Sequence, residues 1–152
     1  DPEVGGGRII GEACHFIDLL TYLSGSSIKS FNTLGSAQSD KIKENIVINL
    51  EFNDGSIGTI FYLSKGAKSF PKERIEIFCD DATIQLDNFI KLKSYGWKGL
   101  SSSSSFNQDK GQSQAIKSFV SAIKNGDKPP IEKKSIFESS RLAIDITENL
   151  KK

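Results

Sequence analysis

Residues 46 to 61 read IVINLEFNDGSIGTIF, and this stretch decides the fold class of the chain. In its first half, every second residue is apolar: Ile46, Ile48, Leu50 and Phe52. The positions between them are Val47, Asn49 and Glu51. Asn53-Asp54-Gly55 follows, and these residue types tolerate positive φ in a tight turn. After the turn the alternation resumes at Ile57, Thr59 and Phe61. A two-residue period interrupted by such a turn predicts an antiparallel β-hairpin.

The same period extends over residues 28 to 98, so the sheet is expected to contain further strands. Residues 74–78 and 83–86 flank the turn-like sequence Asp80-Asp81-Ala82 and predict a second hairpin. Residues 91–97 predict one or two short strands. The serine run 101–105 cannot bury apolar surface and is expected to form a mobile loop.

Helical periodicity replaces the two-residue period on both sides of this region. Residues 8 to 23 have the period of an amphipathic helix, and Gly25 is expected to stop this helix at its C-terminus. One broad arc of the helix is apolar and is expected to face the core; its members are Ile9, Ile10, Ala13, Cys14, Phe16, Ile17, Leu20 and Leu23. Further along, one helix is expected to end at Asn125-Gly126, and a last helix covers about residues 135 to 150. Segregated strands and helices predict an α+β domain, in which helices pack on one face of a mostly antiparallel open sheet.

Length, charge and cysteine content exclude several classes of protein. A chain of 152 residues with a formal net charge of +1 fits one compact domain. Its charges form no long block of one sign, which argues against binding to nucleic acid or an acidic membrane. No apolar stretch approaches the ~20 residues of a bilayer span, so a soluble, cytoplasmic protein is expected. Cys14 and Cys79 are too few for a disulfide framework. The chain holds no methionine and starts at Asp1-Pro2, so we expect a piece of a longer protein.

The glycine run Gly5-Gly6-Gly7 opens the first helix and superficially resembles a loop that binds phosphate at a helix N-terminus. A dinucleotide-binding fingerprint requires a buried strand directly before the glycines, and residues 1–4 cannot form one. No parallel βαβ pattern follows. We therefore interpret the run as a flexible turn and expect no cofactor-binding residue in this chain.

His15 is the single histidine, and it lies on a polar arc of the first helix with Arg8, Gly11, Glu12, Asp18 and Tyr22. This spacing would let the carboxylates of Glu12 and Asp18 set the tautomer and pKa of His15, as in a group that moves protons. The pattern alone is more typical of a polar helix face that meets water. A metal site is not expected, because no second histidine or suitably placed cysteine completes a ligand set.

Aromatic residues are scattered through the strand region at Phe61, Tyr62, Phe78, Phe89, Tyr95 and Trp97. The alternation of a strand would send some of them to the sheet face opposite the helices, where a second subunit or another domain would have to cover them. The alternative is that all of them point inward.

Residues 5 to 20 read GGGRIIGEACHFIDLL, and this stretch resembles the glucose-fructose oxidoreductase, inositol dehydrogenase and rhizopine catabolism (Gfo/Idh/MocA) family. The resemblance continues through residues 75–78, the Asp80-Asp81 turn, residues 119–126, Pro129-Pro130 and residues 138–141. It covers essentially the whole chain, but only the C-terminal half of such an enzyme. The resemblance implies a dihydrodipicolinate-reductase-like C-terminal domain that spans residues 1–152.

Members of that family pair such a domain with an N-terminal Rossmann domain, which carries NAD or NADP and a catalytic lysine and which this chain lacks. By resemblance, His15 matches the histidine that assists proton transfer at the substrate, and Asp18 matches the acidic residue one turn later. The family often has an aspartate four residues before that histidine. Gly11 holds the place here, and Glu12 is displaced by one position, about 100° around an α-helix.

The resemblance implies hydride transfer between nicotinamide and a sugar, sugar nucleotide or cyclitol, with His15 as the catalytic residue. Arg8, Glu12, Asp18 and Tyr22 are the expected substrate-binding residues. Expected partners are the sugar-type substrate, the protein's own Rossmann domain and further copies of the chain through the open sheet face. The alternative is a non-catalytic binding or oligomerisation module of the same fold, which the missing aspartate would suit.

Overall fold

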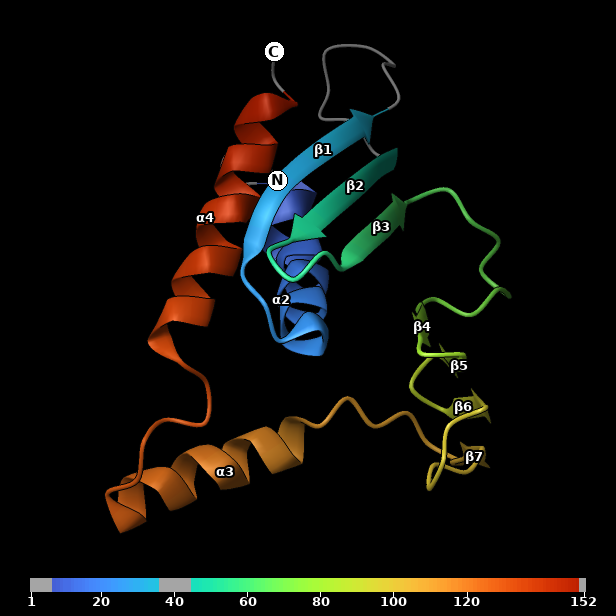
Figure 1. The fold of residues 1–152 in the computed structure, drawn as a ribbon, viewed down its shortest axis with the longest axis vertical. Coiled ribbons are helices and arrows are strands. Elements are labelled where there is room, and N and C mark those ends of the chain that lie inside the picture. Colours follow the sequence, from blue (N-terminus) through green and yellow to red (C-terminus); the bar gives the residue numbers. More distant parts are fainter. Residues whose placement is uncertain (1–6, 36–44, 151–152) are drawn as a thin grey trace. The chain divides into compact units, whose positions relative to one another are not determined.

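The computed structural model describes residues 7–35 and 45–150. The chain divides into two compact units, one formed by residues 1–65 with 131–152 and the other by residues 66–130. Helices and strands are segregated and all paired strands are antiparallel, which confirms the α+β prediction. The strands form two sheets, however, where the sequence suggested one (Figure 1).

The first unit is a three-stranded sheet with helices on one face. Its strands are β1 (Ile28–Gly35), β2 (Asn45–Phe52) and β3 (Ile57–Leu63), in that order across the sheet. Its helices are the π-helix η1 (Ile9–Ala13), α2 (Cys14–Ser24) and α4 (Lys133–Asn149). Gly55, with φ of 89°, supplies the positive φ that the β2–β3 turn requires, which confirms the predicted hairpin.

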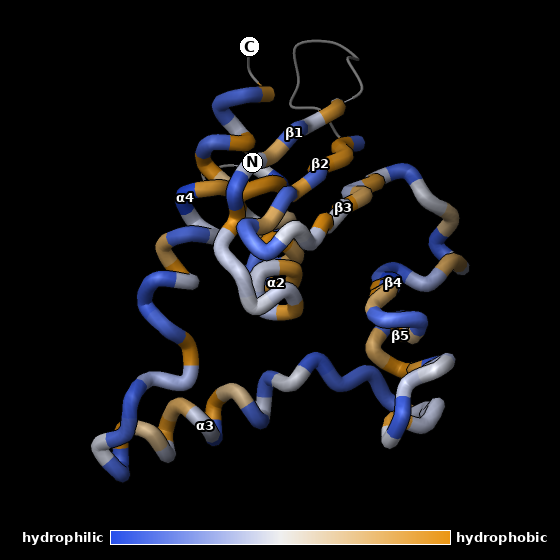
Figure 2. Tube along the Cα trace, viewed as in Figure 1, coloured by the Kyte–Doolittle hydropathy of each residue, from blue (hydrophilic) through white to orange (hydrophobic). Residues whose placement is uncertain are grey.

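The core of this unit lies between the sheet and the helices. The alternating residues of β2 that the sequence placed inside are at most 2% exposed. They pack with residues of η1, α2, β3 and α4, namely Ile9, Ala13, Ile17, Ile60, Leu142, Ala143 and Ile146. Figure 2 shows the apolar stretches of these strands and helices. Gly58 admits the close approach of α2, because a Cβ there would lie 2.8 Å from Leu20 Cδ1.

The first helix begins with a π turn, which changes the apolar arc expected from a regular α-helix. The backbone N–H of Cys14 donates to the carbonyl of Ile9, five residues earlier. A π turn holds more residues than an α turn, so positions four apart stay on one side. The buried positions are accordingly Ile9, Ala13, Ile17 and Thr21, whereas Ile10 and Leu23, both expected in the core, are 37% and 42% exposed. The helix ends at Gly25, which is left-handed as expected.

The second unit contains a four-stranded sheet and the helix α3 (Gln112–Asn125). The strands follow the chain order: β4 (Arg74–Cys79), β5 (Ala82–Asp87), β6 (Lys91–Tyr95) and β7 (Ser103–Ser104). Asp80 and Asp81 both have positive φ between β4 and β5, as a tight hairpin turn requires. The expectation of a mobile loop at 101–105 was wrong for β7, which pairs with Leu92 and Lys91 of β6. Backbone pairing there needs no apolar side chain.

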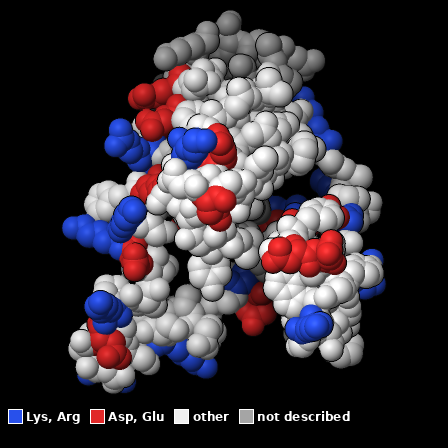
Figure 3. Space-filling view, in the orientation of Figure 1, with Lys and Arg blue, Asp and Glu red and all other residues white. Residues whose placement is uncertain are grey.

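The aromatic residues of the strands do not all point inward. Phe61 is 68% exposed and Phe78 is 74% exposed. In the first unit, the outer face of the sheet carries one apolar row across all three strands, formed by Leu34, Val47 and Phe61 in direct register. Two of these side chains are more than 60% exposed within the described chain. Basic and acidic side chains are interspersed on the face shown in Figure 3.

Candidate functional site

The residues predicted to form a site lie directly before, on and after the π turn. Arg8, Glu12 and His15 are exposed, Tyr22 is 81% exposed, and Asp18 is half-buried. The predicted polar arc therefore does face away from the core. Gly5 and Gly6 of the glycine run lie outside the described residues, and Gly7 has φ of 85° at the start of the helix.

Glu12 is not free on this arc, because it pairs with a residue of the sheet. The hydroxyl of Tyr62 donates a hydrogen bond of 2.5 Å to Glu12 Oε2. Tyr62 stands opposite Ile46 in the β2–β3 register, on the side of the sheet that faces the helices, and its ring packs against the core. The π turn thus presents Glu12 to the exposed end of a tyrosine that the core holds.

Burial raises the pKa of the Tyr62 phenol above its usual value, and the hydrogen bond and negative charge of Glu12 raise this pKa further. The positive charge of Arg8, close to the same hydroxyl, acts in the opposite direction on this pKa. Arg8, Glu12 and Tyr62 therefore form one polar cluster, which we call the Tyr62 cluster. The phenol donates to the carboxylate and lies near the positive charge of the guanidinium.

His15 stands apart from both carboxylates that its spacing suggested as partners. Asp18 Oδ1 accepts a hydrogen bond of 3.4 Å from the hydroxyl of Ser135 on α4, and Glu12 is held by Tyr62. No side chain in residues 7–35 or 45–150 hydrogen-bonds the imidazole, which is exposed at the start of α2. The ring is therefore accessible to an external ligand.

The two cysteines are not poised as nucleophiles. Burial raises the pKa of the Cys14 thiol, and the charge of Asp80 raises that of the exposed Cys79 thiol. A raised pKa leaves little thiolate at neutral pH. Within the described ranges, no group of three or more His, Cys, Asp or Glu side chains could hold a metal ion. None of the helices in those ranges is long and apolar enough to cross a membrane.

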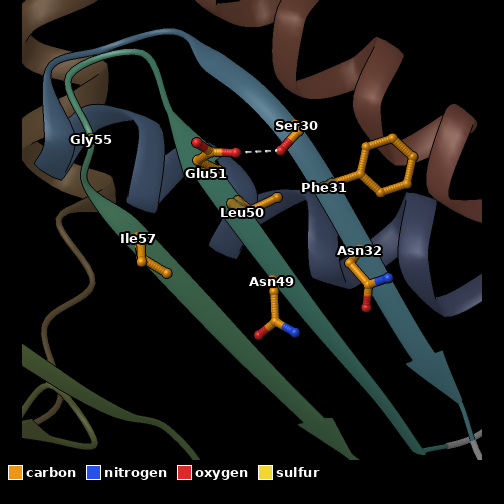
Figure 4. A pocket seen from close by; sticks show the side chains of 8 residues that line it. All are labelled: Ser30, Phe31, Asn32, Asn49, Leu50, Glu51, Gly55 and Ile57. Carbon is orange, nitrogen blue, oxygen red and sulfur yellow. Dashed lines mark hydrogen bonds between the residues drawn. The ribbon is translucent and has the colours of Figure 1, made fainter.

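A shallow depression on the outer face of the sheet is a weaker candidate (Figure 4). It lies along β1, β2 and the β2–β3 turn, and Figure 4 shows the side chains of Ser30 and Glu51 meeting there. Glu51 accepts hydrogen bonds from Lys29 at 2.6 Å and from Ser30 at 2.8 Å, which lower the pKa of its carboxyl group. The carboxylate is already paired, and the depression lies on the face opposite η1 and α2. We therefore place the candidate site at His15 and the Tyr62 cluster.

Sequence reasoning missed Tyr62 as a site residue, although one pattern could have indicated it. Ile46, Ile48 and Leu50 face the helices, and an antiparallel partner shares its inward positions with them. Counting across the turn pairs these residues with Tyr62, Ile60 and Gly58. Tyr62 is the polar member of that inward set, and a phenol at the edge of a core directs its hydroxyl to a partner.

Comparison with known proteins gives a family and a set of similar folds. The model of the GFO/IDH/MocA C-terminal domain family matches residues 1–85. No curated protein gave a significant sequence match.

Three similar solved structures illustrate the likeness of fold. UDP-N-acetylglucosamine 3-dehydrogenase GnnA from Acidithiobacillus ferrooxidans is 16% identical, with a TM-score of 0.76 over 95% of this chain and 50% of that chain. The dehydrogenase MviM from Clostridium difficile is 18% identical, with a TM-score of 0.78 over 93% of this chain and 48% of that chain. The WlbA dehydrogenase from Bordetella pertussis, in complex with NADH and UDP-GlcNAcA, is 15% identical, with a TM-score of 0.63 over 94% of this chain and 43% of that chain. The chain thus spans about half the length of these structures.

Proposed function

The chain belongs to the GFO/IDH/MocA C-terminal domain family, and from this we propose that it is the substrate-side domain of an NAD(P)-dependent oxidoreductase. The reaction is hydride transfer between nicotinamide and a carbon that bears a hydroxyl or carbonyl group, in a sugar, sugar nucleotide or cyclitol. Two similar structures support a sugar nucleotide: one is a UDP-N-acetylglucosamine 3-dehydrogenase, and the other holds NADH and UDP-GlcNAcA.

The observation that carries this proposal is the exposed imidazole of His15, three residues after Glu12 of the Tyr62 cluster. Histidine exchanges protons near neutral pH, and His15 has no partner within the described chain that would occupy its nitrogens. We assign it the proton of the substrate hydroxyl, which must leave as hydride leaves the carbon. Glu12 and Arg8 offer an acceptor and donors to the substrate, and Tyr22 offers an exposed hydroxyl and ring. Asp18 accepts a hydrogen bond from Ser135, so its role in substrate binding is proposed to be less direct than that of Glu12 and Arg8.

The nicotinamide nucleotide, NAD or NADP, is proposed to be held mainly by a Rossmann domain outside this chain. It supplies the hydride acceptor or donor when bound. The residues present fit a substrate-side role better than a cofactor-binding role. Arg8 and Gly7 open a helix, and residues 1–4 do not have the apolar sequence of the strand that a dinucleotide fingerprint requires.

We further propose a cytoplasmic homo-oligomer that uses the outer sheet face. Cys14 and Cys79 are both free thiols, which suits a reducing compartment. The exposed row of Leu34, Val47 and Phe61 is an apolar surface of the kind that a second copy would bury. Light scattering on Phe61→Arg tests this, with Phe78→Arg in the other sheet as control. A smaller particle for Phe61→Arg alone supports the interface, and an unchanged size contradicts it.

The experiment for the proposed function is His15→Ala in the full-length protein. Exposed side chains usually change stability by less than about 0.5 kcal/mol, so the melting temperature should be nearly unchanged. Turnover of a sugar nucleotide should fall about 10²- to 10⁴-fold while cofactor binding is retained, because general acid/base groups contribute that much. Wild-type turnover in the variant would show that His15 is only a solvated residue. A wild-type protein without any turnover would favour the non-catalytic module, which the glycine at position 11 also suits.

A further inference from the structure

Tyr62 is held at both ends, by the core at its ring and by Glu12 at its hydroxyl. Its ring packs against the core of the first unit, next to β2. Its hydroxyl emerges beside the π turn, where it donates to Glu12 and lies near the charge of Arg8. Phenylalanine would fill the same space in the core without fixing the Glu12 carboxylate.

We propose that Tyr62 is a positioning residue of the substrate site, which holds the Glu12 carboxylate in place for the polar groups of the substrate. This rests on the proposed function. Tyr62 acts through Glu12 and not on the reacting atoms.

Flexible side chains explain why such a residue is useful. Glutamate loses considerable rotamer freedom when it is fixed, and Glu12 is exposed here. A strand residue whose ring is packed provides a rigid support for it, as second-layer residues do in sites that must be preorganised. The bond from a phenol to a carboxylate is charge-assisted and therefore stronger than one between neutral groups.

The cluster also leaves groups available for a ligand. Tyr62 occupies Glu12 Oε2, and Glu12 Oε1 accepts no hydrogen bond from the part of the chain that the structure describes. The guanidinium of Arg8 has five N–H donors that a ligand can use. Sugar hydroxyls and the phosphates of a sugar nucleotide are chemically matched to this acceptor and these donors.

The position of the cluster in the chain ties it to His15. Glu12 lies in the π turn and His15 in the first turn of α2, three residues later. π turns within helices occur frequently at functional sites. The same helix therefore carries the proposed proton-transfer group and the two charged side chains, and Tyr62 of β3 fixes Glu12.

The test is Tyr62→Phe in the full-length enzyme, because this change removes the hydroxyl and keeps the ring. We expect KM for the sugar nucleotide to rise about tenfold with kcat changed less than about twofold, since a bond to a charged group contributes binding of that order. Tyr95→Phe is the matched control, because Tyr95 is 55% exposed in the other sheet. It should leave both constants unchanged.

A double-mutant cycle with Glu12→Gln separates positioning from general destabilisation. If Tyr62 acts through Glu12, the effects of the two variants on KM should be less than additive, whereas unrelated structural damage should add. An unchanged KM in Tyr62→Phe, or fully additive effects of the two variants, would overturn the positioning role of Tyr62. The proposed function would still stand in that case, provided that the wild-type enzyme turns over the sugar nucleotide.

A spectroscopic titration reports on the contact without activity. Absorbance of the tyrosinates in the wild type should show a phenol that ionises above the usual range of tyrosine, and this phenol should be missing in Tyr62→Phe and ionise earlier in Glu12→Gln. Wild-type protein with this signature but no turnover of any sugar substrate would remove the proposed function and the substrate role of Tyr62 together. Absence of the signature would overturn the positioning role itself.

Discussion

Replacement of Ile48 by alanine is expected to destabilise the first unit by about 3 kcal/mol. The Ile48 side chain is 0% exposed in the middle of β2. The change removes three carbon atoms, at about 0.8 kcal/mol for each methylene that is no longer buried. The cavity that remains adds to this, which brings the loss into the range of about 2 to 5 kcal/mol observed for such substitutions.

Ile57→Ala is the matched control, because it makes the same chemical change in the next strand. Ile57 is 79% exposed on the outer face, so its replacement should cost less than about 0.5 kcal/mol. Urea unfolding followed by circular dichroism measures both, and the slope with denaturant should be unchanged. Equal losses for the two variants in a monomeric sample would refute the assignment of the inner and outer faces of the sheet. A loss for Ile57→Ala that appears only in oligomeric samples would instead locate the interface.

Three further outcomes are expected. Gly96→Ala should destabilise the second unit by about 1 to 3 kcal/mol more than Gly99→Ala, as measured by thermal unfolding. Both glycines have positive φ, but only at Gly96 would an added Cβ lie 2.7 Å from the carbonyl oxygen of Asp81. Equal losses would contradict this contact. The pKa of Tyr62 is raised in the folded state, so its contribution to stability should be fully present below its unfolded pKa of 10.0 and lost as pH rises through the folded pKa. The free energy of unfolding should therefore decline less steeply above that pH in Tyr62→Phe than in the wild type. The same decline in both proteins would contradict the raised pKa of Tyr62. Finally, calorimetric titration of the 152-residue chain with NADH should show no micromolar binding, with circular dichroism as the control for folding.

The strands were predictable because their pattern is local. The alternation from Ile46 to Phe52 and the Asn53-Asp54-Gly55 turn required only neighbours in sequence, and β2 and β3 form where expected. The same holds for the Asp80-Asp81 turn. These segments combine a correct period with residue types that tolerate the required φ, so local and global preferences agree.

The first helix was predicted in extent but not in its face. A periodicity of 100° per residue assumes α geometry throughout, and the π turn at Ile9–Ala13 breaks that assumption. Its effect is visible in Ile10, which turns toward solvent, and in Thr21, which is buried and donates its hydroxyl proton to the carbonyl of Ile17. A buried threonine that satisfies its own hydroxyl along the helix leaves no distinctive sequence pattern.

The partners of the candidate site were not predictable from spacing on one helix. Glu12 and Tyr62 are 50 positions apart, and Asp18 and Ser135 are 117 apart. Each contact depends on how η1 and α2 lie against β3 and α4, which a helical wheel does not contain. The wheel correctly indicated that these side chains leave the core, but assigned the carboxylates to His15, whereas tertiary contacts assign them to the sheet and to α4.

Register links the strand pattern to the site. Side chains alternate across a strand, so a shift of one residue between β2 and β3 would turn Tyr62 outward and bring Phe61 or Leu63 beside the π turn. The turn opposes such a shift, because the N–H of Gly55 bonds the carbonyl of Phe52 at 3.0 Å. The core opposes it more strongly, since Ile60, 6% exposed, would leave the apolar interior. The hairpin that decides the fold class therefore also decides which β3 side chain meets Glu12.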